Sequence, residues 1–347
     1  MNAFFPAQAL SGYIDNFDWN IFEFTQSKFK ELHFSIRLPE GFNKVSEEGN
    51  APSLQKPYID AAYFKAGNGN AEVLVQVSAI EHEVSLLNYY LNFINEGKEQ
   101  LLDYRLINDN QDQPDILSEM TFPDNQRWLT RKTGFKVWNG SGAFVVTINA
   151  ACNATKYHED AAHVILAIAQ SLKPLYPVEY AFAEIQYLIT RRYPLDFACY
   201  LPVSWHELHH HNNTMDYMNL SYIKKINGNP IGILFIQVKA VAQNETFETI
   251  LSHFHKAYSE RYTINNLHLH PTKRLKCFSE KVLEGCATLQ PQEAEITAFN
   301  TINFYLTKYN SNWLYIEMFG HAKEENFEAW AVCDRALDLM KESFKVL

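Results

Sequence analysis

The sequence has no surplus of basic residues and no long apolar run, and each absence removes a class of partner. With 30 Lys and Arg against 40 Asp and Glu, the net charge is −10. A nucleic-acid-binding face needs clustered Lys and Arg to displace the counterions of phosphates. No apolar run reaches the ~18 residues of a membrane helix. We therefore expect neither nucleic-acid binding nor membrane insertion.

Paired cysteines and a leader peptide are also missing. The five cysteines are scattered without C-x-x-C spacing, which favours reduced thiols over a disulfide framework. The opening MNAFFPAQALSGYIDNFDW has no basic leader, and Pro6 and Asp15 interrupt its apolar residues, so it is not typical of a secretory signal. We expect a cytoplasmic protein.

Signatures of nucleotide binding and of serine hydrolysis do not occur. There is no G-x-G-x-x-G, no G-x-x-x-x-G-K-[ST] and no G-x-S-x-G. Gly140-Ser141-Gly142 falls between two predicted strands, which favours a hairpin tip over a nucleophile. We expect no cofactor and no enzymatic activity.

What the sequence does contain is an internal repeat. At 347 residues, with 47% apolar and 20% charged residues, the chain suits two domains. HFSIRLPEGFNKV (33–45) aligns with DFACYLPVSWHEL (196–208), so that Leu38-Pro39 falls on Leu201-Pro202. A period this long indicates duplicated folding units.

The repeat continues downstream in the same order. Each copy has an Asn-Gly hairpin turn, at Asn68-Gly69 and Asn227-Gly228. Strands at 73–80 and 233–241 follow, then helices that open on Ser85 and Thr246 as N-caps. Late strands at 143–150 and 313–319 precede closing helices, which end at Ser171-Leu172-Lys173 and Ser343-Phe344-Lys345.

These elements predict an α+β fold of two tandem domains, each an antiparallel sheet packed with helices. We expect an aromatic N-terminal arm at 1–27 that packs onto the first domain. The first domain should cover 28–177 and the second 191–347. Between them, we expect a connector at 178–190 that forms a helix or a strand.

One motif points to a different class of protein. His206-Glu207-Leu208-His209-His210 satisfies the zinc-protease pattern H-E-x-x-H, which requires a continuous helix. Pro202 and Asn212-Asn213 leave room for about two turns at most, and the first copy has no ligands in the matching stretch, 42–46. We interpret the motif as a decorated loop and predict no metal site.

Metal chemistry is nevertheless the alternative. Nine of the thirteen histidines lie in the second copy. His268 and His270 would share a face if their segment is a strand. The candidate ligands are therefore His206, His210, His268 and His270, and the alternative function is a metal-dependent hydrolase that uses the histidine-rich second domain.

The repeat unit resembles the PsbP and DcrB-like family in its F-x-x-x-L-P strand, its strand ending in V-Q-V or I-Q-V, its capped helix and its closing helix. The resemblance implies a non-enzymatic binding or assembly domain. The family includes the Eag adaptors of type VI secretion, dimeric cytoplasmic chaperones that hold hydrophobic segments of effectors against the sheet. A tandem chain would be an internal pseudo-dimer able to act as a monomer.

Strand alternation predicts where such a segment would bind. Val73, Val75 and Val77 face one side of a strand, and Leu234, Ile236 and Val238 are their counterparts. If helices cover only that side, the opposite face stays open. We therefore predict a protein-binding adaptor, chaperone or scaffold for a bacterial secretion or membrane-associated assembly, with contacts at Leu74, Gln76, Phe235 and Gln237.

Overall fold

The computed structural model divides into two compact units, Met1–Ala183 and Glu184–Leu347. It describes residues 3–49, 58–97, 99–140, 142–208, 213–242, 245–256, 262–272, 282–292 and 299–347, together with the single residues 52, 259 and 275. Ser141 and residues 209–212 lie outside this described part.

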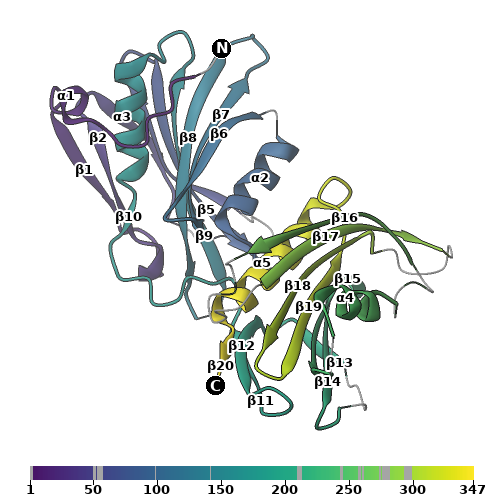
Figure 1. Cartoon of the computed structure of the whole chain (residues 1–347). Coiled ribbons are helices and arrows are strands. Elements are labelled where there is room, and N and C mark those ends of the chain that lie inside the picture. The colour runs from purple at the N-terminus through teal and green to yellow at the C-terminus, as the bar shows by residue number, and fades with distance from the viewer. Residues whose placement is uncertain are drawn as a thin grey trace. The chain divides into compact units, whose positions relative to one another are not determined.

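Unit 1 contains ten strands and three α-helices among its described residues (Figure 1). In chain order they are α1 (Ser11–Ile14), β1 (Trp19–Phe24), the 3-10 helix η1 (Lys30–Leu32), β2 (Phe34–Pro39), β3 (Phe42–Glu47), β4 (Tyr58–Ala66), β5 (Ala71–Ile80), α2 (Leu86–Glu96), β6 (Glu99–Ile107), β7 (Asn110–Thr121), β8 (Arg127–Trp138), β9 (Ala143–Asn153), α3 (Glu159–Gln170) and β10 (Lys173–Pro174).

Unit 2 repeats most of this order. Its elements are β11 (Gln186–Arg191), β12 (Phe197–Pro202), β13 (His206–Leu208), β14 (Tyr217–Ile226), β15 (Asn229–Ala240), α4 (Phe247–Lys256), β16 (Tyr262–Thr272), β17 (Val282–Pro291), β18 (Thr301–Tyr309), β19 (Asn312–Gly320), α5 (Phe327–Ser343) and β20 (Lys345–Val346).

The two units have the same sheet topology. The large antiparallel sheet of unit 1 has the order β3-β4-β5-β9-β8-β7-β6, and that of unit 2 has the order β13-β14-β15-β19-β18-β17-β16. Each unit adds a three-stranded sheet, β1-β2-β10 or β11-β12-β20. The predicted α+β class with two tandem antiparallel domains is therefore confirmed.

Local sequence signals explain the shared elements. Asn227 and Gly228 have φ of 51° and 80° at the β14–β15 turn, where residues that tolerate positive φ are required. The Ser85 hydroxyl accepts from the Asn88 amide at 3.1 Å and begins α2. The Thr246 hydroxyl accepts from the Thr249 amide at 3.2 Å and begins α4. Both predicted N-caps are confirmed.

The closing helices are tied to β2 in unit 1 and to β12 in unit 2 in the same way. The Ser171 hydroxyl accepts from the Arg37 amide at 2.8 Å, and the Ser343 hydroxyl accepts from the Tyr200 amide at 2.9 Å. Two residues after each serine the chain pairs with the same strand, as β10 on β2 and as β20 on β12. In each unit, the Ser-apolar-Lys ending thus joins the closing helix to that strand.

Helices lie on both faces of each large sheet. In unit 1, Val73, Val75 and Val77 are fully buried against α3 and the small sheet, and we call this side the α3 face. Helix α2 packs its apolar residues against Val145 and Ile116 on the opposite side, the α2 face. Strand alternation alone predicts that the α2 face is uncovered. In the structure α2 covers part of this face, and only the part beside α2 is uncovered.

Unit 2 follows the same plan. Leu234, Ile236 and Val238 are fully buried beneath α5 and β12, as the alternation predicts. On the other side, Ile250 and Leu251 of α4 join an aromatic cluster that contains Phe304 and Tyr315.

Candidate functional site

The predicted contact residues Leu74 and Gln76 line a pocket on the α2 face of unit 1. The pocket has a volume of about 250 Å³ and lies between α2 and strands β5, β7, β8 and β9. Its lining includes Phe93 of α2 and Phe122, which are 50% and 37% exposed. Exposed aromatic rings at a concave site mark a place where apolar groups can bind. We call this site the α2 pocket.

Polar side chains across five strands form the floor of the α2 pocket. Lys132 Nζ donates to Glu99 at 3.0 Å and to Asn149 Oδ1 at 3.1 Å. Asn149 Nδ2 donates to Gln76 Oε1 at 3.4 Å, and Gln76 Nε2 donates to Asp60 Oδ1 at 2.8 Å. The α2 pocket therefore has amide and ammonium groups in its floor and the aromatic rings of Phe93 and Phe122 at its rim.

The charged pair in this floor is almost completely desolvated. The side chains of Lys132 and Glu99 are 4% and 3% exposed. Burial lowers the pKa of the Lys132 ammonium, and the Glu99 carboxylate opposes that shift. The Ser118 hydroxyl also donates to Glu99 at 2.8 Å. Burying charges is expensive unless they are paired and hydrogen-bonded, so this pair is a costly feature of the sheet.

The repeat shows what unit 2 has at the same positions. Leu74 pairs with Asn149 across the strands, as Phe235 pairs with Glu317, so the registers correspond. Gln237 Nε2 donates to Glu317 Oε2 at 3.2 Å, the counterpart of the Gln76–Asn149 contact. Gln237 is 6% exposed, whereas Gln76 lies in the floor of the open α2 pocket.

Aromatic rings fill the corresponding space in unit 2. Lys132 pairs with Asn149 as Phe304 pairs with Glu317, so Phe304 stands in the place of Lys132. By the same registers Phe319 stands in the place of Ala151. Phe304 is 0% and Phe319 is 3% exposed, and Phe235 packs edge-on against Phe319 at 5.8 Å. Of the two predicted contact residues of unit 2, Phe235 therefore packs against an aromatic cluster, and Gln237 is buried beside it in β15.

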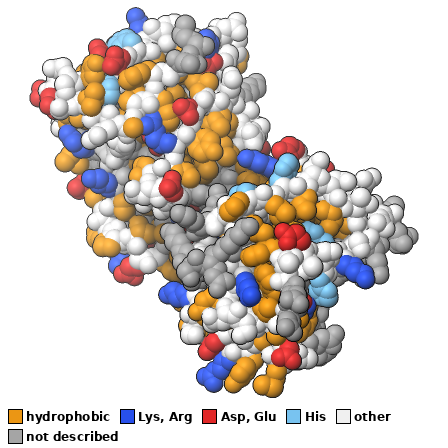
Figure 2. Space-filling view, viewed as in Figure 1, with side chains coloured by type: hydrophobic (Ala, Val, Ile, Leu, Met, Phe, Trp, Pro, Cys, Tyr) orange, Lys and Arg blue, Asp and Glu red, His pale blue; other side chains and the backbone are white. Residues whose placement is uncertain are grey.

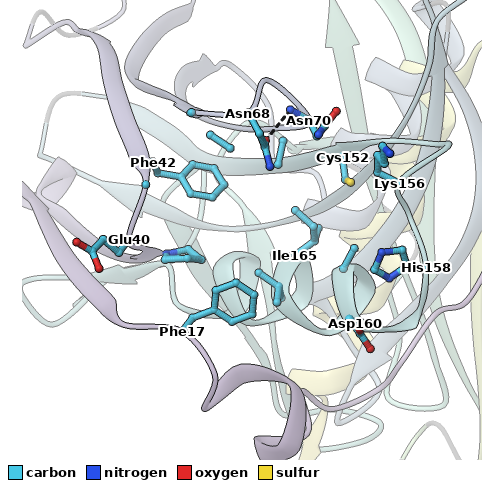
Figure 3. Close-up of a pocket in the computed structure, with 17 residues that line it drawn as sticks. Phe17, Glu40, Phe42, Asn68, Asn70, Cys152, Lys156, His158, Asp160 and Ile165 are labelled. Atoms are coloured by element: carbon cyan, nitrogen blue, oxygen red, sulfur yellow. Dashed lines mark hydrogen bonds between the residues drawn. The ribbon is translucent and has the colours of Figure 1, made fainter.

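A larger cavity of about 570 Å³ lies on the other side of unit 1 (Figure 3). Phe17 and Phe42 lie on one side of it, and Lys156 and His158 lie on the other. Cys152 also lines the cavity, and burial raises the pKa of its thiol to about 11. Since the thiolate is the nucleophile and the metal ligand, Cys152 is not activated for either role at neutral pH.

The described histidine candidates lie on opposite edge strands of the large sheet of unit 2, His206 on β13 and His268 and His270 on β16. His206-Glu207-Leu208 forms the edge strand β13, paired with β14. The loop interpretation is therefore wrong for these three residues, because they continue the sheet as β3 does in unit 1, and His210 lies outside the described residues. His268 and His270 lie on β16, where His270 Nε2 is 3.4 Å from Glu284 Oε2. The described residues contain no group of three or more His, Cys, Asp or Glu placed to hold a metal ion.

The surface carries charges of both signs. On the visible face in Figure 2, Lys and Arg side chains are scattered among acidic ones. Within the described residues, no helix is long and apolar enough to cross a bilayer.

Comparisons with known proteins return structural similarities alone. No protein-family model and no curated protein sequence matches the chain. Among solved structures, the chain is similar to the cyanobacterial PsbP protein (CyanoP) of Synechocystis sp. PCC 6803, with 9% sequence identity and a TM-score of 0.33, over 50% of this chain and 100% of that one.

The chain is also similar to TplEi, a type VI secretion immunity protein of Pseudomonas aeruginosa solved in complex with an "L" peptide. Here the identity is 10% and the TM-score 0.22, over 94% of this chain and 98% of that one. CyanoP is a PsbP protein, and PsbP is the family that the sequence resembles.

Proposed function

We propose that this chain is a non-catalytic protein-binding module whose α2 pocket holds an apolar segment of a partner protein. The observation that carries the proposal is the contrast between the repeats. Unit 2 fills this region with Phe304 and Phe319, whereas unit 1 keeps Lys132 and Ala151 at the same positions. Unit 2 shows that this fold can fill the region with aromatic side chains, whereas unit 1 keeps a pocket over a desolvated ion pair. This contrast supports a functional role for the pocket, kept at a cost in stability.

The chemistry of the α2 pocket fits an extended peptide segment. One large apolar side chain that enters beside Leu74 and Phe93 would contribute about 1.5–3 kcal/mol. The amide of Gln76 and the neighbouring polar floor offer partners to the backbone groups of the segment, which otherwise lose hydrogen bonds to water. We therefore assign Leu74 and Gln76 to binding, and Phe235 and Gln237 to the packing of unit 2.

We also propose a cellular role from the sequence. An adaptor, chaperone or scaffold for a bacterial secretion or membrane-associated assembly would use this kind of site. A cytoplasmic location and action as a single chain with two similar units accord with scattered cysteines and an internal repeat. The alternative, a metal-dependent hydrolase, needs a helix from His206 onward, where β13 lies.

The proposal is tested by selecting peptides from a random library on the purified full chain. The best peptide is then labelled, and its Kd is measured by fluorescence anisotropy. Ala151→Phe installs the residue of unit 2 and should fill the α2 pocket, so we expect at least about a tenfold weaker Kd, since tenfold is about 1.4 kcal/mol. Gln76→Arg, which changes the floor of the pocket, should also weaken binding.

The matched control adds the same ring elsewhere. Asn20→Phe places it on the exposed edge strand β1, and its Kd should stay within about twofold of the unmodified chain. If the folded Ala151→Phe and Gln76→Arg variants bind the peptide as tightly as the unmodified chain, the α2 pocket is not the binding site.

A further inference from the structure

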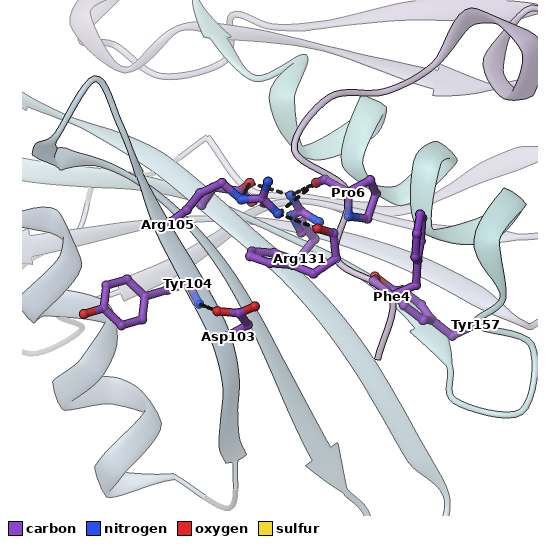
Figure 4. A network of polar contacts seen from close by, with 9 residues as sticks. Phe4, Pro6, Asp103, Tyr104, Arg105, Arg131 and Tyr157 are labelled. Atoms are coloured by element: carbon purple, nitrogen blue, oxygen red, sulfur yellow. Dashed lines mark hydrogen bonds and ion pairs between the residues drawn. The ribbon is translucent and has the colours of Figure 1, made fainter. Parts of the chain in front are cut away.

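On the α3 face of unit 1, mostly buried charged side chains bind the chain's own N-terminal residues (Figure 4). Arg131 of β8 is fully buried and forms a two-contact ion pair with Asp115 of β7. Arg105 of β6 approaches the same carboxylate, with its Nε 3.3 Å from Asp115 Oδ2. Two guanidinium groups thus share one carboxylate in a mostly buried place. We call Arg105, Arg131 and Asp115 the arginine cradle.

The arginine cradle binds the backbone of the arm. Arg105 Nη2 donates to the carbonyl oxygens of Phe5 and Pro6 at 2.7 and 2.9 Å. Arg131 Nη2 donates to the carbonyl oxygen of Pro6 at 2.8 Å. The Tyr157 hydroxyl donates to the carbonyl oxygen of Phe4 at 3.2 Å. Side chains therefore hold three successive carbonyl groups, which is how a receptor holds an extended peptide ligand.

The side chains of the arm complete this recognition. The guanidinium carbons of Arg105 and Arg131 lie 3.9 and 4.0 Å from the centroid of the Phe5 ring. A cation over an aromatic face is stabilised by the ring quadrupole, most strongly where water is excluded. Pro6 is buried and has no amide hydrogen that would need a partner there. An aromatic residue followed by proline is thus the sequence that this surface fits.

The two arginines of the cradle occur only in the repeat whose N-terminal arm they bind. The strand registers place His270, Glu284 and Asn303 of unit 2 at the positions of Arg105, Asp115 and Arg131. The residues before unit 2 are bound elsewhere, because the Tyr180 carbonyl accepts from the Trp138 amide at 3.1 Å, within unit 1. The copy with an arm has two arginines, and the copy without an arm has neither.

We propose that the arginine cradle is a peptide-binding site for an extended segment in which an aromatic residue precedes proline, and that Phe4–Pro6 of the arm is its intramolecular ligand. The arm then blocks the site in the intact chain, because tethering gives it an effective concentration in the millimolar range. Once the arm is absent, the same sequence binds from solution.

The test removes residues 1–9 and supplies the arm as a peptide. A labelled peptide of residues 2–10, NAFFPAQAL, is titrated with the shortened chain and with the full chain, and anisotropy reports binding. The shortened chain should bind saturably, with at least about tenfold preference over the Phe5→Ala peptide. The full chain should show at least about tenfold weaker binding.

Arginine variants locate the site. In the shortened chain, Arg105→Gln should weaken peptide binding at least about tenfold. Its matched control is Arg127→Gln, which removes an arginine from β8 that pairs with Glu119 and is 55% exposed; this change should leave the Kd within about twofold. The proposal is overturned if the folded shortened chain binds neither NAFFPAQAL nor its Phe5→Ala variant, or binds the two peptides equally.

A second design avoids dependence on the shortened chain. A protease site is inserted between Gln8 and Ala9 of the full chain, and the folded protein is cut so that the arm stays bound as a free peptide. Excess labelled NAFFPAQAL should then exchange into the cut protein and not into the uncut one. Equal uptake by the cut and the uncut protein would contradict the assignment.

Discussion

The buried Lys132–Glu99 pair in the floor of the α2 pocket yields a sharp prediction about stability. Lys132→Met removes the ammonium and leaves the Glu99 carboxylate, 3% exposed, with its hydrogen bond from the Ser118 hydroxyl at 2.8 Å. Removing one partner of a buried pair typically costs 3–5 kcal/mol, because an uncompensated charge remains. Since Ser118 still donates to Glu99, we expect a loss near the lower end, about 3 kcal/mol.

The double variant separates the pair from its parts. Replacing a buried pair with uncharged groups of similar size is often neutral or stabilising, so Lys132→Met with Glu99→Gln should recover most of the lost stability. Guanidinium denaturation curves of the unmodified chain and of the single and double variants give the free energies of unfolding, with the transition of unit 1 fitted separately.

The same curves can refute the reasoning. If Lys132→Met alone lowers the free energy of unfolding by less than about 1 kcal/mol, the pair is as weak as a solvent-exposed one. The floor of the α2 pocket would then be hydrated, and its charges would give no sign of selection for function over stability.

Three further predictions concern packing, the repeat and pH. Gly134→Ala should destabilise unit 1 by about 1–3 kcal/mol in thermal denaturation, because a Cβ there would collide with the carbonyl oxygen of Val146 beneath Tyr90 of α2; an unchanged Tm would contradict the packing of this face. Ser171→Ala and Ser343→Ala should each cost about 1 kcal/mol in urea denaturation, since the two hydroxyls accept from amides of β2 and β12 respectively, and a loss for only one would contradict their equivalence. Burial beside aromatic rings lowers the pKa of His255 from its ordinary 6.5 to about 4, so the unfolded chain binds the extra proton between these pH values. Stability should therefore fall by about 1–2 kcal/mol, after allowance for partial exposure, as the pH drops from 7.5 to 4.5. His255→Phe should remove this part of the pH dependence, and an identical pH profile for the variant would refute the assignment.

Much of the fold could be predicted from the sequence because the repeat gives two independent sequences for most elements. Leu38-Pro39 and Leu201-Pro202 locate β2 and β12, and alternation identifies Val75 and Ile236 as core residues. Helix α2 could be placed along the chain from its N-cap Ser85, but the side of the sheet on which it lies could not. That side depends on contacts between residues far apart in sequence, such as Ile94 with Ile116.

The candidate site could be predicted only in part for the same reason. Alternation placed Leu74 and Gln76 on the α2 face, and it placed Phe235 and Gln237 on the matching face of unit 2. It could not show that Phe319, which comes from another strand, packs against Phe235 and fills the second site.

Neither Lys132 nor the arginine cradle was predicted from the sequence. An alternating strand such as 127–138 contains basic residues at both kinds of position, and the sequence alone does not show that Arg131 and Lys132 are both buried on opposite faces. Aligning β8 with β18 would have placed Lys132 on Phe304, and this exchange of a charge for a core aromatic is the signal that could have revealed the pocket.

The most direct test of the account is photo-cross-linking of the selected peptide from the two equivalent positions. A benzophenone side chain is placed at Leu74 in one variant and at Phe235 in another, and the cross-linked fraction is measured by mass spectrometry. We expect strong cross-linking from position 74 that excess unlabelled peptide abolishes, and only background from position 235. Equal cross-linking from both positions, or none from position 74, would contradict the assignment of partner binding to unit 1.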